Sequence, residues 1–197
     1  MQNPGRPREF DPDETLGKIL DLFWRHGYEA TGLSDIIAAT GLGKASLYAT
    51  FGNKQSMYLK ALSRYEAQTV DAAVTLLRDT SHAAGERIDM FLTLPIAARR
   101  DHNDWRGCFL CNASVDRASM DAETGALVRR GYEKMRCAIA HALAQEAPDA
   151  GAAAIAARAQ LVLTVYSGLR VMARSGIEFE ALSLAKEQTL AAVTAGL

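Results

Sequence analysis

Two cysteines with helical spacing, Cys108 and Cys111, are the residues best suited to covalent or redox chemistry. Gly107 is predicted to start a helix at this point, and residues three apart in a helix share a face. A helix amino terminus lowers the pKa of a thiol, and the neighbouring Arg106 favours the thiolate further. Three interpretations stay open: packing as small hydrophobic residues, a thiol sensor of oxidants or electrophiles, and a soft-metal site formed by the two cysteines with or without His102.

A second set of residues has the types that contacts with DNA require. Lys44 and Lys54 can pair with phosphates, and the Tyr48 hydroxyl can donate a hydrogen bond to a phosphate or pack against the next helix. Thr31 is expected at the start of a helix, where it can contact a phosphate, cap the helix, or do both. Small residues on the outer face of a short helix can meet base edges in the major groove. These small residues are Ala45, Ser46 and Ala49.

The elements that position this second set are two helices joined by a glycine turn, between Thr31 and Lys60. The first helix is expected to end at Gly41, because glycine readily adopts the left-handed conformation that closes a helix. Leu47 and Phe51 lie one turn apart in the second helix and define its buried face. From residue 36 to residue 65 the sequence has four Lys or Arg residues and no Asp or Glu, as a phosphate-facing surface requires. The stretch therefore predicts a helix-turn-helix.

A joint pattern of residues extends this prediction from about Phe10 to Leu62. Its members are Phe23, Gly27, Tyr28, Thr31, Ile36, Gly41, Lys44, Ser46, Leu47, Tyr48, Phe51, Lys54 and Leu59. Together they resemble the amino-terminal domain of TetR-family transcriptional regulators, and the segments at residues 5–11 and 23–31 resemble one subgroup of that family. Ile37 and Thr40 depart from the pattern, because the family more often has Ala there.

Helical patterning continues along the rest of the chain and predicts an all-α fold with about nine helices. The first helix is expected from Asp11 to Tyr28, and a long helix from Asn53 to about Asp79. Further helices are expected near residues 83–98, 109–119, 123–145, 152–175 and 179–195. We predict two domains: a three-helix helix-turn-helix DNA-binding domain with an amino-terminal arm (residues 1–60), and a larger helical effector-binding and dimerisation domain (residues 61–197).

Composition restricts the class of protein further. The chain has 197 residues and is 49% hydrophobic and 23% charged, as is ordinary for a soluble globular protein. The net charge is -1, so any contact with DNA depends on a local patch. Arg6 and Arg8 belong either to a flexible leader or to an arm that contacts phosphates or the minor groove. No apolar run matches a membrane span, no signal-peptide core is present and no motif predicts a cofactor, so we expect a cytoplasmic protein without a cofactor or structural metal.

The carboxyl-terminal half holds the predicted dimer surface and effector site. The last two helices carry small and aliphatic residues on much of their circumference, which indicates burial on more than one face. TetR-like proteins dimerise through this helix pair, and a two-fold dimer reads a pseudo-palindromic operator. Arg170, in an otherwise apolar helix, can line a pocket or form a salt bridge across the dimer. The candidate effector residues are Cys108, Cys111, Trp105, Phe109, Tyr166 and Arg170, with Tyr132 and Met135 as further lining residues.

These observations predict a sequence-specific DNA-binding transcriptional regulator that is not an enzyme. The simplest form is a homodimeric repressor released from its operator by an unknown small-molecule effector or by thiol modification. A thiol-dependent enzyme and an architectural DNA-binding protein without an effector are the alternatives, and activation instead of repression stays open. No motif places a His and a carboxylate beside either cysteine, which argues against the enzyme.

Overall fold

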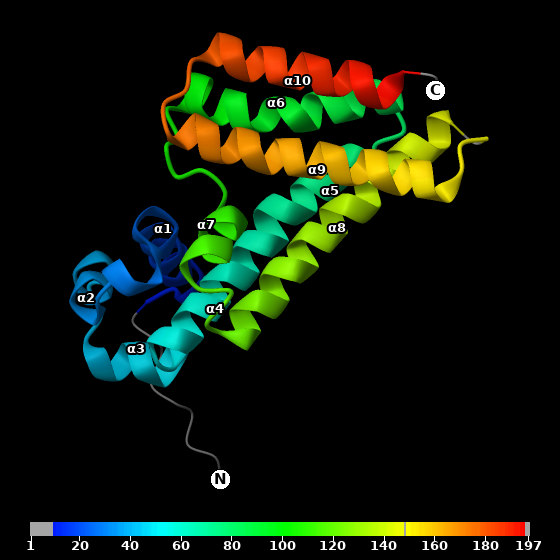
Figure 1. Cartoon of the computed structure of the whole chain (residues 1–197). Helices are drawn as coiled ribbons and strands as arrows, with labels where there is room; N and C mark the ends of the chain where they lie inside the picture. Colours follow the sequence, from blue (N-terminus) through cyan, green and yellow to red (C-terminus); the bar gives the residue numbers. More distant parts are fainter. Residues whose placement is uncertain (1–9, 148, 196–197) are drawn as a thin grey trace. The chain divides into compact units, whose positions relative to one another are not determined.

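The computed structural model describes residues 10–147 and 149–195, and within these ranges it contains helices and loops but no strand (Figure 1). The contacts divide the chain into two compact units between Arg64 and Tyr65. If the continuous helix from Lys54 to Arg78 is counted once, the described residues form nine helices, so the all-α prediction is confirmed. Arg6 and Arg8, the cations of the predicted arm, lie outside the described residues.

The first unit contains the predicted helices, with bounds that differ by one or two residues from those expected. They are α1 (Pro12–Ala30), α2 (Leu33–Thr40), α3 (Lys44–Phe51) and most of α4 (Lys54–Tyr65). Asp11 caps α1 through a 2.8 Å hydrogen bond from the Asp13 backbone N–H. Gly27 interrupts the last turns of α1 with a φ of 79°, which a residue with a side chain adopts only at a cost. Phe23 is fully buried and packs edge-on against Tyr58, with ring centroids 5.1 Å apart.

The start of α2 differs from the prediction. The N-cap residue is Gly32, whose backbone N–H donates to the Asp35 carboxylate at 2.7 Å, so the prediction that Thr31 caps this helix is wrong. The end of α2 is as predicted, because Gly41 has a φ of 72° and its N–H donates to the Ile37 carbonyl. A carboxylate in the first turn replaces the threonine cap, since it satisfies the same kind of unpaired N–H group.

The long helix predicted from Asn53 to about Asp79 is present, but its middle is not α-helical. After α4 the backbone continues as the π-helical segment η1 (Glu66–Val70) and then as α5 (Asp71–Arg78). A π-helical turn is a local widening of the helix that hydrophobic periodicity does not reveal.

The second unit packs the remaining helices around α9. These helices are α6 (Ala84–His102), α7 (Phe109–Asp116), α8 (Ala122–Glu146), α9 (Ala152–Arg174) and α10 (Phe179–Thr194). Helices α6, α9 and α10 lie side by side, whereas α8 packs along α5 and crosses α9 (Figure 1). Phe91 of α6 stacks on Tyr166 of α9 with ring centroids 4.1 Å apart, at the centre of this core.

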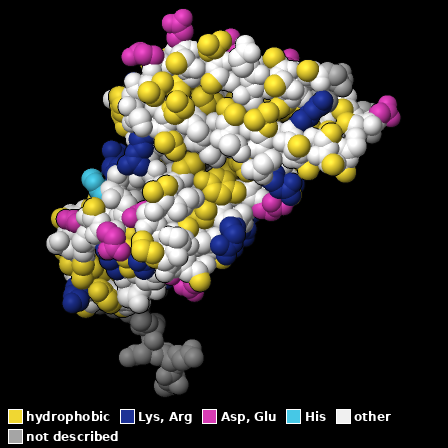
Figure 2. All heavy atoms as spheres, in the orientation of Figure 1, with side chains coloured by type: hydrophobic (Ala, Val, Ile, Leu, Met, Phe, Trp, Pro, Cys, Tyr) yellow, Lys and Arg dark blue, Asp and Glu magenta, His cyan; other side chains and the backbone are white. Residues whose placement is uncertain are grey.

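Helices α9 and α10 also present apolar side chains to solvent. Figure 2 shows hydrophobic side chains spread over the upper part of this view, with acidic and basic side chains at its edges. The exposed large residues of α9 and α10 are Leu161, Val171, Met172 and Leu184. Contrary to expectation, α9 is long and apolar enough to cross a membrane, with a mean hydropathy of 1.3, but a core helix of a soluble protein meets the same criterion. It packs against α6, α7, α8 and α10, but only 33% of its most apolar stretch is buried in the described structure.

Candidate DNA-binding interface and buried thiol site

Helix α3 turns one face to the core of the first unit and the other to solvent. Leu47 is fully buried and Phe51 is 4% exposed, as their spacing predicts. The exposed residues of the helix are Lys44, Ala45, Ser46, Tyr48 and Ala49. The helix follows Gly43 without a side-chain cap and without an acidic residue in its first turn. Its amino end and outer face therefore suit contact with phosphates and base edges.

Two of the four cations in the acid-free stretch are engaged within the first unit. Lys60 donates through Nζ to the Phe51 carbonyl at 2.8 Å. Arg64 of α4 forms a two-point ion pair with the carboxylate of Asp13 at the start of α1. These two cations thus hold helices together, and they are poor candidates for phosphate contacts.

The other two cations, Lys44 and Lys54, form no ion pair with a described residue, and each lies near an aromatic ring. The Lys44 ammonium is 5.7 Å from the centroid of the Tyr48 ring, and the Lys54 ammonium is 4.3 Å from that of Tyr28. A ring in this position orients the lysine and leaves its charge available to an anion. Tyr48 itself is 41% exposed, so its hydroxyl does not pack in the core.

Thr31 lies apart from this exposed group. It is 1% exposed, and its hydroxyl donates to the Gly27 carbonyl at 2.7 Å. The hydroxyl therefore closes the last turn of α1 in this conformation, and only the neighbouring amino end of α2 faces outward.

Cys108 and Cys111 lie at the amino end of α7 in the second unit. Cys108 is the N-cap residue, so the helix begins at Phe109, as the predicted range 109–119 has it, and Gly107 does not start it. Gly107 instead has a φ of 73°, and an added Cβ would lie 3.5 Å from the Arg170 carbonyl oxygen. Both thiols are free and buried, with 3% of Cys108 and 7% of Cys111 exposed. Cys108 thus has the position at a helix terminus that favours a thiolate.

The pKa values of the two thiols are shifted in opposite directions, mainly by the hydrogen bond between them. A hydrogen bond from the Cys111 thiol, the charge of Arg170 and a 3.4 Å hydrogen bond from the Tyr65 hydroxyl lower the pKa of Cys108 to about 6, against the effect of burial. The pKa of Cys111 is raised, because its proton is held by Cys108 and the thiol is buried. The Tyr132 hydroxyl donates to Cys111 at 3.4 Å. Of the two thiols, Cys108 is therefore the one that loses its proton more readily, and Cys111 stabilises the resulting thiolate.

Arg170 brings a buried positive charge to this cluster. It is 8% exposed, and its guanidinium donates to the Tyr166 hydroxyl at 3.0 and 2.8 Å. No described carboxylate forms an ion pair with it, and the charge interactions that raise its pKa come from Tyr166, Tyr65 and Cys108. The charge of Arg170 in turn helps to lower the pKa of the Cys108 thiol and of the Asp104 carboxyl.

The structure brings together five of the six residues predicted for the effector site. Cys108, Cys111, Phe109, Tyr166 and Arg170 form one buried cluster. Trp105 does not join them, because it is 47% exposed, stacks on Arg99 and donates to Asn103.

Sequence reasoning missed Tyr65 and, although it named Tyr132 as a lining residue of an effector pocket, it did not place a groove between α8 and α9. Tyr65 lies 43 residues before Cys108, so no local pattern linked the two. A groove of about 610 Å³ opens between α8 and α9, and Tyr132 and Ser167 are among its lining residues. Since Tyr132 reaches Cys111, the groove and the thiol cluster share a side chain. Among the described residues no group of three or more His, Cys, Asp or Glu side chains could hold a metal ion.

Comparison with known proteins agrees with the helix-turn-helix. The family described as "Bacterial regulatory proteins, tetR family" matches residues 16–61. The HTH-type transcriptional repressor ComR of Escherichia coli K12 is 51% identical over 61 residues, which are 31% of this chain and 29% of ComR. The match therefore spans less than a third of ComR. The HTH-type transcriptional repressor BdcR of the same organism is 28% identical over 183 residues, 91% of this chain and 87% of BdcR.

Solved structures extend the similarity to the whole fold. A cysteine mutant of the TetR family transcriptional regulator CifR, complexed with 26-bp double-strand operator DNA, superposes with a TM-score of 0.80 at 25% identity, over 95% of this chain and 99% of CifR. Reduced NemR of E. coli has the same fold, with a TM-score of 0.76 at 19% identity over 92% of this chain and 96% of NemR. With the matching helix-turn-helix and the matching fold of the second unit, the chain belongs to the TetR family of DNA-binding transcriptional regulators.

Proposed function

We propose that this regulator is a cytoplasmic homodimeric repressor that binds a pseudo-palindromic operator and has no enzymatic activity. The observation that carries the proposal is the outer face of α3, which exposes Lys44 and small residues while Leu47 and Phe51 anchor the helix. ComR and BdcR, to which the chain is similar, are named as repressors, and the CifR complex contains operator DNA.

The proposed contacts follow from exposure and chemistry. Lys44, Tyr48 and Lys54 contact phosphates, and Ala45, Ser46 and Ala49 of α3 meet base edges. Thr31 is proposed as a positioning residue, because its hydroxyl closes the last turn of α1 on the Gly27 carbonyl just before α2 begins. Phosphate contacts set affinity and register, while the small residues of α3 set sequence preference.

The proposed dimer uses the exposed apolar surface of α9 and α10, with Leu161, Met172 and Leu184 at its centre. Large apolar patches of this kind mark interaction surfaces. A two-fold dimer would present two α3 helices to successive major grooves, about 34–36 Å apart. One short helix reads few bases, and the dimer doubles that number.

Two inputs to the second unit are proposed as release signals. A small molecule would bind the groove between α8 and α9, which has the volume of a typical ligand site. An oxidant or electrophile would modify Cys108, the thiol with the lowered pKa. Either input must bind or react differently in the DNA-bound and released states, since only such a difference shifts the equilibrium.

The test is fluorescence anisotropy on DNA from upstream of the protein's own gene, with the thiols reduced and then oxidised. The proposal expects salt-sensitive, sequence-selective binding that weakens after oxidation. Selective binding that does not change on oxidation would exclude thiol modification as the release signal and leave a small molecule in the α8–α9 groove as the proposed signal. Binding that is equally strong on unrelated DNA would instead favour an architectural protein.

A further inference from the structure

The π-helical segment η1 begins immediately after Tyr65, within an otherwise continuous helix. A π-helical turn has poorer hydrogen-bond geometry than an α-helical one, so it persists only where surrounding contacts favour it, and it is frequent at functional sites. The contacts around η1 therefore indicate what holds the turn in place.

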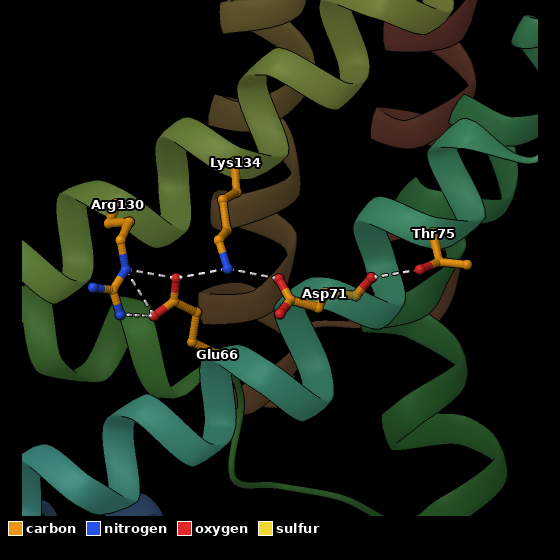
Figure 3. Close-up of polar contacts among 5 residues, drawn as sticks. All are labelled: Glu66, Asp71, Thr75, Arg130 and Lys134. Carbon is orange, nitrogen blue, oxygen red and sulfur yellow. Dashed lines mark hydrogen bonds and ion pairs between the residues drawn. The ribbon is translucent and has the colours of Figure 1, made fainter.

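A buried carboxylate fixes the first residue of η1. Glu66 is 3% exposed and accepts hydrogen bonds from Arg130 of α8 at 2.9 and 3.1 Å (Figure 3). Lys134, one turn further along α8, lies 3.0 Å from the same carboxylate and 2.8 Å from Asp71, the first residue of α5. The two cations lower the pKa of Glu66, Arg130 more strongly than Lys134. We call these four residues the η1 clamp, because they tie both ends of the π-helical segment to α8.

The residue before the clamp contacts the thiol site. Tyr65 is 1% exposed, its hydroxyl donates to Cys108, and its ring packs edge-on against Phe109 at 5.8 Å. Two consecutive residues thus bind different helices, Tyr65 to α7 and Glu66 to α8. A group added to the Cys108 sulfur must displace the Tyr65 hydroxyl, while the ion pairs hold Glu66. The strain falls on the helix at the junction of α4 and η1.

We propose that η1 is the coupling element of this regulator: a change at Cys108 displaces Tyr65, and the π-helical turn, held at Glu66, converts that displacement into a change of helical register in α4. The proposal rests on the proposed function and names the residues that transmit its regulation. One residue of register corresponds to a rotation of about 100° and a rise of about 1.5 Å. Tyr65 and Glu66 are positioning residues, since neither is assigned a contact with DNA or effector.

The test compares Glu66→Gln with Glu123→Gln, which removes the same charge from an exposed residue in the first turn of α8. Loss of one acidic charge by itself strengthens binding to DNA. Before alkylation, Glu66→Gln should therefore bind the operator at least as tightly as wild type. On Cys108 alkylation with iodoacetamide, its loss of operator affinity should be about tenfold smaller than that of wild type, because residue 66 is no longer held and moves with Tyr65. Glu123→Gln should stay within about twofold of wild type in both measurements. Equal behaviour of the two variants, with unchanged helicity, would overturn the proposal.

A second variant tests the π-helical turn directly. Deletion of the exposed Gln68 removes the extra residue of the turn and leaves an α-helical register. This variant should bind the operator but lose the response to Cys108 alkylation. A deletion variant that responds as wild type does would show that the turn is not needed for coupling.

Hydrogen exchange over residues 65–78 separates failure of this inference from failure of the proposed function. Alkylation of Cys108, and equally Glu66→Gln, should accelerate exchange in this segment, whereas Glu123→Gln should not. If the wild type binds no DNA selectively, the proposed function fails, and the exchange measurement alone decides whether Cys108 is coupled to η1. If the wild type binds and responds but exchange in the segment is unchanged, the inference fails and the function stands.

Discussion

Replacing Cys111 with Ala should raise the pKa of Cys108 by an amount set by the hydrogen bond that is lost. The Cys111 thiol is the largest of the influences that bring the pKa of Cys108 to about 6. A hydrogen bond to a charged group contributes about 1.5–3 kcal/mol, which is about one to two pKa units. The Ala variant should therefore titrate at about pH 7–8. At pH 7 the thiolate fraction would fall from about nine-tenths to between about one-tenth and one-half.

The assay is the rate of iodoacetamide alkylation of Cys108 between about pH 5 and pH 9, in a Cys137→Ser background that removes the exposed thiol. Limited access to the buried sulfur scales the rate similarly at every pH, so the midpoint reports the pKa. Cys111→Ser is the matched control, because its hydroxyl still donates and the midpoint should stay near that of the parent. A shared midpoint for the Ala and Ser variants, or a parent midpoint near the ordinary value of 9.0, would refute the reasoning.

The same shift makes folding stability depend on pH. The folded pKa of Cys108 is about 6 and the ordinary value is 9.0, so between these values the unfolded chain binds more protons than the folded one. The free energy of unfolding should therefore rise with pH across this window. The contribution is complete above the unfolded pKa and is lost as pH falls through the folded one. Urea unfolding at several pH values should show a smaller rise in the Cys111→Ala variant.

Three further predictions concern other parts of the chain. Lys44→Ala should weaken binding to every DNA sequence and flatten the slope of log affinity against log salt by about 0.9 per protomer. An unchanged slope would show that Lys44 does not contact a phosphate. Gly131→Ala should lower the free energy of unfolding, measured in urea, by about 1–2 kcal/mol. The reason is that the new Cβ would lie 2.6 Å from Leu110 Cδ1, where α7 packs on α8. A more stable variant would contradict this packing. Leu184→Glu should yield monomers in analytical ultracentrifugation with unchanged helicity, because it places a charge on the exposed apolar surface of α10. A variant that stays dimeric would show that the interface lies elsewhere.

The parts of the structure that sequence reasoning predicted depend on local rules. Gly41 ends α2 because a left-handed residue closes a helix, and Leu47 and Phe51 are buried because residues one turn apart share a face. The π-helical turn was not predictable in this way. Its Glu66 carboxylate is balanced by Arg130, 64 residues further along the chain, and no periodicity encodes that pairing.

In the candidate thiol site, too, local rules predicted some contacts and missed those between residues far apart in the sequence. The spacing of Cys108 and Cys111 placed both at one helix terminus, but the sequence also suggested Trp105 as a neighbour. The left-handed Gly107 turns the chain between Trp105 and α7, so proximity in sequence does not become contact. Tyr65 could be found only after folding brought it to Cys108.

The buried charge of Arg170 explains why modification of one thiol could control this protein. Within the second unit, the guanidinium is compensated by tyrosine hydroxyls and by the Cys108 sulfur, and no described carboxylate pairs with it. Alkylation or oxidation to a disulfide removes the thiolate charge and leaves the buried cation with the tyrosine hydroxyls and the charge interaction with Asp104. Loss of one partner from a buried ion pair costs about 3–5 kcal/mol, whereas loss of a neutral hydrogen bond costs about 1 kcal/mol. The larger cost corresponds to about two to four powers of ten in an equilibrium constant, enough to repopulate a two-state regulator. Arg170→Met should therefore remove most of the response of operator affinity to Cys108 alkylation, even where alkylation remains complete by mass spectrometry. If operator affinity still responds fully in that variant, the response comes from the bulk of the group added to Cys108 and not from the lost thiolate charge.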